Sequence, residues 1–264
     1  MRHALRLVLA MLLLAGLAGC ALWRPMKVPM DIVQVPAQCT APVDTLVVFL
    51  PGVYSRPKEF IHEGMVQTLR DRHVAADVWI VDAHVGYYEA RSIIDRIQAD
   101  VIVPARERGY RHVWLVGVSI GGFGALIHSL SHPGEADGIV VIAPYLGQRA
   151  VLEEIRGAGG LRTWVAPGGD LSLEQMDLIL WRWLQGYVDS RSPRPPLYLG
   201  AGRDDRFADA HTLLGAALPR ERVFISAGGH DWAPWREVWR QIVPVLPLPI
   251  DASCGDRAES RHPG

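Results

Sequence analysis

Short runs of apolar, largely β-branched residues recur along the chain from residue 45 onward. They cover residues 45–50, 77–81, 112–118, 138–143, 196–200 and 222–226. Because these runs are apolar almost throughout, and not at every second position, they predict strands buried on both faces of a parallel sheet. Helical spacing separates them and is clearest over 87–108, where one face carries Ala90, Ile93, Ile94, Ile97 and Val101. The alternation predicts an α/β fold with one mostly parallel, doubly wound sheet.

One connection is much longer than the others. Residues 146–194 separate two predicted strands that a handful of residues would suffice to join. Ser172 with Gln175 three residues later forms a capping box, which predicts the start of a helix. The stripe that follows is apolar: Leu173, Met176, Leu180, Trp183 and Tyr187. We therefore expect a modest helical insert, acting either as a lid or as a packed excursion without a gating role.

The amino-terminal residues have the pattern of an export signal. Arg2 and Arg6 precede the apolar run 7–19, which is shorter than the roughly 20 residues that a membrane-spanning helix needs. The run ends in Leu17-Ala18-Gly19-Cys20, which resembles the lipobox of a bacterial lipoprotein precursor. The alternatives are an ordinary secretory signal, or a buried helix with a chance cysteine.

The lipobox resemblance implies a chain cut before Cys20, so that residues 1–19 are a signal peptide and Cys20 carries the lipid. Several acyl chains on one residue give stable membrane anchoring. Ala21, which is not aspartate, implies sorting to the outer membrane, facing the periplasm. We expect residues 20–44, with four prolines and an edge strand over 31–35, to form a lipid-anchored tether.

Export to the envelope also affects the expected state of the other two cysteines. In an oxidising envelope, Cys39 and Cys254 are left as a pair, and a disulfide between them is expected, two free thiols being the alternative. Such a bond would link the tether to a tail over 251–264, on either side of a folded domain over 45–250.

Composition narrows the class of protein further. The 264 residues are 49% hydrophobic and 21% charged, which excludes a disordered chain. Twenty-seven basic and 28 acidic residues give a net charge of −1, so nucleic acid is not an expected partner. The same balance favours an uncharged or apolar small molecule as substrate.

The best candidate nucleophile is Ser119. It lies in Gly117-Val118-Ser119-Ile120-Gly121, between a predicted strand and a predicted helix. A G-x-S-x-G pattern at such a junction is typical of a nucleophile elbow, in which the serine sits on a strained turn. The glycines are needed because side chains two residues away would collide with the strand or the helix.

A base and an acid follow in the order that this geometry requires. His230 comes directly after the last predicted strand, and the adjacent Asp204 and Asp205 come directly after the preceding one. All of them therefore fall at the carboxyl edge of the sheet, where open α/β sheets bind ligands. Spacing alone leaves Asp204 and Asp205 as alternatives for the acid.

With Ser, Asp and His in this order, the chain resembles the α/β-hydrolases, and the Gly-Gly-His-Asp-Trp stretch around His230 is similar to the histidine loop of several serine esterases. The likeness covers about residues 45–244. It implies Asp205 as the acid and backbone N–H groups of Val53 and Ile120 as the oxyanion hole. It also implies acyl-enzyme chemistry that requires neither metal nor organic cofactor.

Other functions remain open. An acyltransferase or thioesterase would use the same triad, and a non-catalytic envelope lipoprotein could use the fold as a binding module. His128 and His132, four residues apart, have a spacing that can bind zinc, but without a third ligand we expect ordinary surface histidines.

Overall fold

The computed structural model describes residues 24–189 and 194–254. The predicted signal peptide (1–19) and the predicted lipid-bearing Cys20 lie outside these residues. Within them, seven strands form one sheet in the order β1-β3-β2-β4-β5-β6-β7. The strands are β1 (Ile32–Val35), β2 (Thr45–Leu50), β3 (Asp77–Val81), β4 (His112–Val118), β5 (Gly138–Ile142), β6 (Leu197–Gly202) and β7 (Val223–Ser226). Only the edge strand β1 is antiparallel to its neighbour, so the predicted mostly parallel sheet is confirmed.

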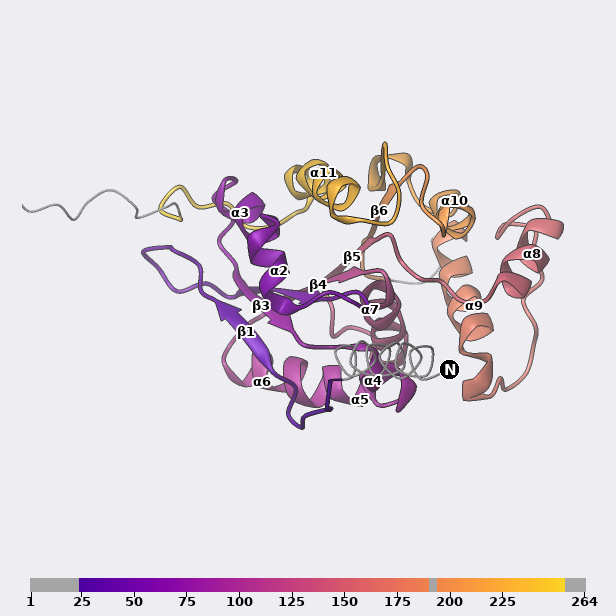
Figure 1. The fold of residues 1–264 in the computed structure, drawn as a ribbon, viewed down its shortest axis with the longest axis horizontal. Helices are drawn as coiled ribbons and strands as arrows, with labels where there is room; N and C mark the ends of the chain where they lie inside the picture. The colour runs from indigo at the N-terminus through magenta and orange to yellow at the C-terminus, as the bar shows by residue number, and fades with distance from the viewer. Residues whose placement is uncertain (1–23, 190–193, 255–264) are drawn as a thin grey trace, which may run out of the picture.

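Helices cover both faces of the sheet (Figure 1). One face carries α2 (Pro57–His62), α3 (Met65–Arg70) and α11 (Trp232–Ile242). The other carries α5 (Ile93–Ile97), α6 (Val103–Glu107), α7 (Ile120–Ser131) and α10 (Ala208–Gly215). Strand β2 shows the cause, since Leu46 and Val48 pack into one core and Val47 and Phe49 into the other.

The segment 87–108, where the helical spacing is clearest, forms several helical pieces. A short α4 (Val85–Glu89) is followed by Arg91, whose φ of 54° is left-handed, and Ser92 closes the turn by donating its N–H to the Tyr87 carbonyl at 2.9 Å. Helical structure resumes with α5 and passes through a π-helical turn over Gln98–Ile102. Pro104 lacks the N–H that would bond to the carbonyl four residues before it, which accounts for the loosened turn.

The insert forms two helices, α8 (Arg149–Gly157) and α9 (Met176–Asp189). The predicted capping box is present, with the Ser172 N–H donating to Gln175 Oε1 at 3.1 Å. Helix α9 packs Leu180, Trp181 and Leu184 into the core shared with α7. The Trp181 indole N–H is satisfied by the Leu146 carbonyl at 2.7 Å.

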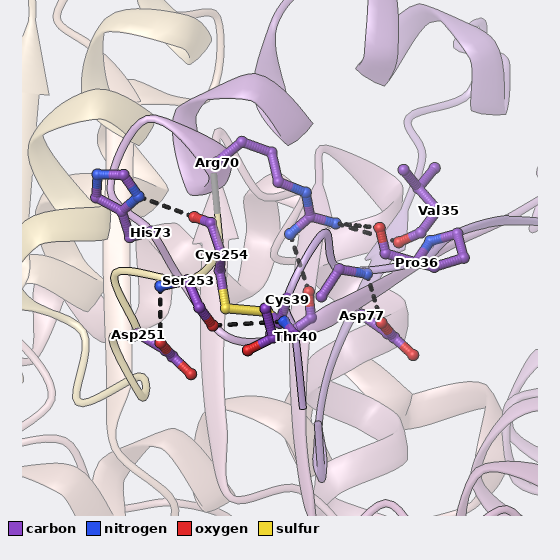
Figure 2. Close-up of a disulfide and its surroundings, with 12 residues drawn as sticks. Val35, Pro36, Cys39, Thr40, Arg70, His73, Asp77, Asp251, Ser253 and Cys254 are labelled. Atoms are coloured by element: carbon purple, nitrogen blue, oxygen red, sulfur yellow. Dashed lines mark hydrogen bonds between the residues drawn. A yellow bond between two sulfur atoms is a disulfide. The ribbon is translucent and has the colours of Figure 1, made fainter. Parts of the chain in front are cut away.

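The segment from Arg24 to Asp44, expected as a tether, makes extensive contacts with the domain. Strand β1 extends the sheet, and Met30 is buried. Cys39 is joined to Cys254 by a disulfide, beside the Arg70 guanidinium, which donates to the carbonyls of Val35, Pro36 and Ala76 (Figure 2). The chain is thus fixed to the domain both by hydrogen bonds and by a covalent bond.

Candidate active site

Ser119 occupies the sharp turn between β4 and α7. Its φ of 54° and ψ of −117° are strained for a residue with a side chain. Four backbone hydrogen bonds hold the turn: Ser119 donates to Ile142, and its carbonyl accepts from Gly122, Phe123 and Tyr145. The surrounding structure therefore determines a conformation that the residue alone would avoid.

The two glycines of the motif are required by close backbone approach. A Cβ added at Gly117 would overlap the carbonyl oxygen of Gly121, and one added at Gly121 would overlap the carbonyl oxygen of Leu50. Both obstacles are backbone atoms, which cannot rotate away. The G-x-S-x-G pattern is therefore a packing requirement of this turn.

The structure brings Ser119, His230 and Asp205 into one hydrogen-bonded chain. His230 Nε2 lies 3.0 Å from Ser119 Oγ, and His230 Nδ1 lies 2.8 Å from Asp205 Oδ2. A carboxylate can only accept, so Nδ1 carries the proton and Nε2 is free to accept the Ser119 hydroxyl. This is the tautomer in which an imidazole can act as a general base toward the serine.

The structure distinguishes the two candidate acids. The Asp205 side chain is fully buried and receives the backbone N–H of Phe207 at 2.8 Å in addition to the His230 bond. Asp204 is exposed, and its backbone N–H donates to Gly228. The residue implied by the family resemblance, Asp205, is therefore the one that contacts His230.

The charge of Asp205 is maintained in spite of its burial. Burial disfavours the carboxylate, but the hydrogen bonds from His230 and from the Phe207 N–H outweigh it and lower the pKa of Asp205 below its ordinary value of 3.8. A carboxylate that stays ionised at neutral pH can stabilise the imidazolium formed when His230 accepts a proton.

Two aromatic rings hold the imidazole in place. Phe207 and Trp235 pack edge-on against His230, with ring centroids 5.2 and 5.1 Å away and interplanar angles of 89° and 87°. The role of Phe207 is not apparent from the sequence, although it lies only two residues after Asp205. Its ring, held on the Asp205 loop, restricts the rotation of His230.

A cavity of about 340 Å³ opens at Ser119. Its walls come from the turn after β2 (Gly52, Val53, Tyr54, Ser55), from the histidine loop and α11 (His230, Asp231, Trp232, Trp235), and from Glu59 and Arg206. No described residue of the insert, 146–189, lines it. In this structure the insert is a packed excursion and does not cover Ser119.

The oxyanion-hole residues implied by the resemblance lie next to Ser119. Ile120 is the first residue of α7, so its N–H has no partner within the helix. Val53 lines the cavity, in a turn that comes so close that a Cβ at Gly52 would lie 3.3 Å from Ser119 Cβ. Ile120 adjoins Ser119 in the chain and Val53 lines the same cavity, and the role of their amides as oxyanion donors remains a prediction.

Metal-binding residues are not assembled among the described residues. His128 and His132 stack with ring centroids 4.8 Å apart, but His128 Nε2 is bonded to Gln98 at 2.9 Å. No group of three His, Cys, Asp or Glu within residues 24–189 and 194–254 could hold an ion. His128 is fully buried and not on the surface as expected.

Solved structures share the fold of this chain, whereas sequence comparisons find no relative. No family model matches the sequence, and no curated protein sequence matches it. Among solved structures, S-formylglutathione hydrolase from Staphylococcus aureus is 12% identical with a TM-score of 0.56, over 81% of this chain and 91% of that one. Est1E from Butyrivibrio proteoclasticus is 11% identical with a TM-score of 0.55, over the same shares of the two chains.

A third structure, a predicted CIB-like hydrolase from Thermoplasma acidophilum, is 13% identical with a TM-score of 0.51, over 81% of this chain and 97% of that one. Likeness at such low identity concerns the arrangement of strands and helices. The chain has the α/β-hydrolase fold, as its motifs predict.

In the part of the chain that the structure describes, every helix is too short or too polar to cross a bilayer.

Proposed function

We propose that this chain is a serine hydrolase of the carboxylesterase type, acting through an acyl-enzyme. The observation that carries the proposal is the continuous chain Ser119–His230–Asp205, with distances of 3.0 and 2.8 Å, at the wall of an open cavity. Nucleophile, base and orienting acid are within hydrogen-bonding reach of one another, as acyl transfer requires.

The reaction proceeds in two halves. Ser119 Oγ attacks the ester carbonyl while its proton passes to His230 Nε2, and the N–H groups of Val53 and Ile120 receive the oxyanion. The tetrahedral intermediate breaks the ester bond, and His230 returns the proton to the leaving alcohol. Water, deprotonated by His230, then attacks the acyl-enzyme, which releases the carboxylic acid and restores the Ser119 hydroxyl.

The walls of the cavity support the proposed substrate class. Val53, Tyr54, Trp232 and Trp235 present mainly apolar surface, while Glu59 and Arg206 carry opposite charges. These walls support an uncharged or apolar ester as the small-molecule substrate. An acyltransferase or thioesterase would use the same three residues with a different acyl donor or acceptor.

We further propose that the protein is anchored in the bacterial envelope through lipid on Cys20, facing the periplasm from the outer membrane. Support comes from the lipobox pattern ending at Cys20 and from the Cys39–Cys254 disulfide, which suits an oxidising compartment. Metabolic labelling with an alkyne fatty acid should tag the wild-type protein and leave Cys20→Ala untagged. Equal tagging of the two would contradict anchoring at this residue.

Active-site labelling tests the catalytic proposal. A fluorophosphonate probe should label the folded wild-type protein, and Ser119→Ala should not be labelled. The variant Ser129→Ala alters a buried serine on α7 whose hydroxyl donates to the Ala125 carbonyl of the same helix at 2.8 Å; it is the matched control and should label like the wild type. Absence of wild-type labelling would favour the non-catalytic binding module.

p-Nitrophenyl esters of graded length, followed by acyl thioesters, then define the acyl donor.

A further inference from the structure

Arg24 lies beside the catalytic cavity. Arg24 Nη2 donates to the carbonyl of Ser55 at 3.3 Å, and Arg24 Nη1 forms an ion pair with Asp82. Ser55 belongs to the turn that lines the cavity at Ser119. The side chains of Arg24 and Asp82 are only 20% and 22% exposed, so this is a partly buried contact and not a loose surface pair.

The residues after Arg24 are fastened as well. The Lys27 N–H donates to the Tyr87 hydroxyl at 2.8 Å, and that hydroxyl donates to the Lys27 carbonyl at 2.9 Å. The Met30 N–H donates to the buried carboxylate of Asp100 at 3.0 Å. Figure 1 shows this indigo segment passing α4 before it enters β1. The position at which the chain approaches the domain is therefore fixed relative to the cavity.

Chain length limits the distance between the cavity and the proposed anchor. Three residues lie between Cys20 and Arg24, so four residue-to-residue steps join them; at no more than about 3.6 Å per step, the connection spans at most about 14 Å. If Cys20 carries lipid, the membrane surface lies within that distance of Arg24. The turn after β2, which Arg24 contacts, is then among the parts of the domain nearest to the bilayer.

The cavity rim next to Arg24 has the chemistry of a membrane-facing surface. We define the rim as residues 53–61, the turn after β2 with most of α2. Tyr54 is 72% exposed and Ile61 is 40% exposed, with the exposed cations Arg56 and Lys58 between them. Exposed aromatic and aliphatic side chains suit the headgroup boundary, and cations are attracted to anionic lipid.

The acidic side chains nearby leave the rim with a net positive charge. Residues 53–61 contain the cations Arg56 and Lys58 against the single carboxylate of Glu59, and the neighbouring Glu63 pairs with Arg236 at 3.1 Å. On the approaching segment, Met26 and Val28 are also exposed. Exposed apolar groups thus occur on both sides of the Arg24 contact.

We propose that the rim rests on the bilayer that holds the Cys20 lipid, and that the ester cleaved at Ser119 is an acyl ester resident in that bilayer. The inference depends on the proposed hydrolase activity and anchor. The short, fastened connection turns the cavity mouth toward the membrane, so an amphiphilic ester enters from the lipid without crossing water.

Bilayer contact is tested first, without any activity measurement. Ile61→Cys and the control Val245→Cys are prepared in the full-length acylated protein; Val245 is 48% exposed and follows α11, which leads away from the cavity. Cys39 and Cys254 are bonded and Cys20 is acylated, so only the new thiol reacts with an environment-sensitive fluorophore. In phosphatidylethanolamine–phosphatidylglycerol vesicles containing a spin-labelled quencher lipid, we expect quenching at 61 and none at 245. Equal behaviour at the two positions overturns the proposal.

Activity then tests the substrate. Ile61→Asp should lower release of oleate from dioleoylglycerol in those vesicles by at least about tenfold, since a buried aliphatic contact is replaced by a charge near lipid. Hydrolysis of dissolved p-nitrophenyl butyrate should be unchanged, and Val245→Asp should affect neither ester. If Ile61→Asp and Val245→Asp behave alike, the proposed route from the bilayer is wrong. If the wild type hydrolyses neither ester, the hydrolase function fails, while the fluorescence result still decides the bilayer contact.

A third experiment inserts a spacer between the anchor and the rim. Twenty Gly/Ser residues inserted between Leu22 and Trp23 would let the domain drift by about 25 Å. We expect lower dioleoylglycerol hydrolysis and unchanged p-nitrophenyl butyrate hydrolysis. Unchanged hydrolysis of both esters would show that the short connection plays no part in substrate access.

Discussion

The two edges of the sheet are built by different means. At the carboxyl edge, Ser119 is held on a strained turn between glycines, and its partners His230 and Asp205 lie on the loops after β7 and β6. At the amino edge, side chains join segments that are far apart in the sequence. The connections include the Cys39–Cys254 disulfide, the Asp44–Arg111 ion pair, and the hydrogen bond between His112 and Asp137.

The difference indicates that the carboxyl edge determines activity and the amino edge contributes to stability. The carboxyl edge depends on close backbone approach and on hydrogen-bond distances, so small changes there should cost activity. The amino edge ties distant parts of the chain together, so changes there should cost stability and leave the Ser119 site intact. The following variants test that difference, from the largest expected effect to the smallest.

Asp205→Asn should lower kcat by about 10⁴-fold, because an amide favours the imidazole tautomer that cannot accept the serine proton. Asp204→Asn, one residue away and exposed, should retain wild-type kcat. Initial rates with a p-nitrophenyl ester compare the two. Equal losses would mean that the acid has been misassigned.

Replacing both Cys39 and Cys254 by serine should lower the free energy of unfolding by about 4 kcal/mol, since the bond closes a very long loop in the unfolded chain. Urea denaturation measures this loss. The kcat of the folded variant should equal that of the wild type, since the bond lies at the edge away from Ser119. A large fall in kcat of the folded variant would show that the two edges are coupled.

Gly121→Ala should destabilise the fold by about 3 kcal/mol and lower kcat, because the new methyl group overlaps the Leu50 carbonyl. Gly157→Ala is the matched control, since a Cβ there meets nothing within 4 Å at the end of α8. Thermal denaturation should show the control at least as stable as the wild type. Similar losses in both variants would contradict the packing argument.

Helix α7 runs from Ser119 toward the amino edge, and near its far end lies His128. Burial, with a smaller effect of His132, lowers the pKa of His128 to about 3 from an ordinary value of 6.5. Between these values the unfolded chain binds the proton and the folded one does not. The contribution of neutral His128 to the free energy of unfolding is therefore complete above pH 6.5. It falls as the pH falls, and about 2 kcal/mol of it is lost at pH 5.

His128→Gln should remove this pH dependence while it keeps a polar partner for Gln98. Urea denaturation of the two proteins at pH 7 and pH 5 gives the comparison. Asp205 does not interfere, because its lowered pKa means that its contribution is lost only below 3.8. Equal losses between pH 7 and pH 5 in the two proteins would show that His128 is not the group responsible.

Much of the fold and of the site is encoded locally, which is why sequence patterns predict them. The buried strands are continuous apolar runs, and the loops with Ser119, Asp205 and His230 each follow one directly. The position of the break near Arg91 is not marked in the sequence, because the apolar spacing continues through this left-handed residue.

Contacts between distant segments were not predictable in the same way. Phe207 against His230 and Arg24 against Ser55 depend on how loops from different strands meet in space. The same holds for Glu59 and Arg206, which line the same cavity although they are far apart in the sequence. Periodicity reports the burial of one element at a time, so it carries no information on these pairs.

The two outermost strands of the sheet, β1 and β7, affect how readily the protein aggregates. Both β1 and β7 are only four residues long; Pro36 follows β1 directly, and Arg222 directly precedes β7. Short margins bordered by proline or charge offer little unpaired backbone to a neighbouring chain. If the chain is anchored as proposed, it meets its own copies far more often than a protein in solution does, and these margins would discourage edge-to-edge aggregation there.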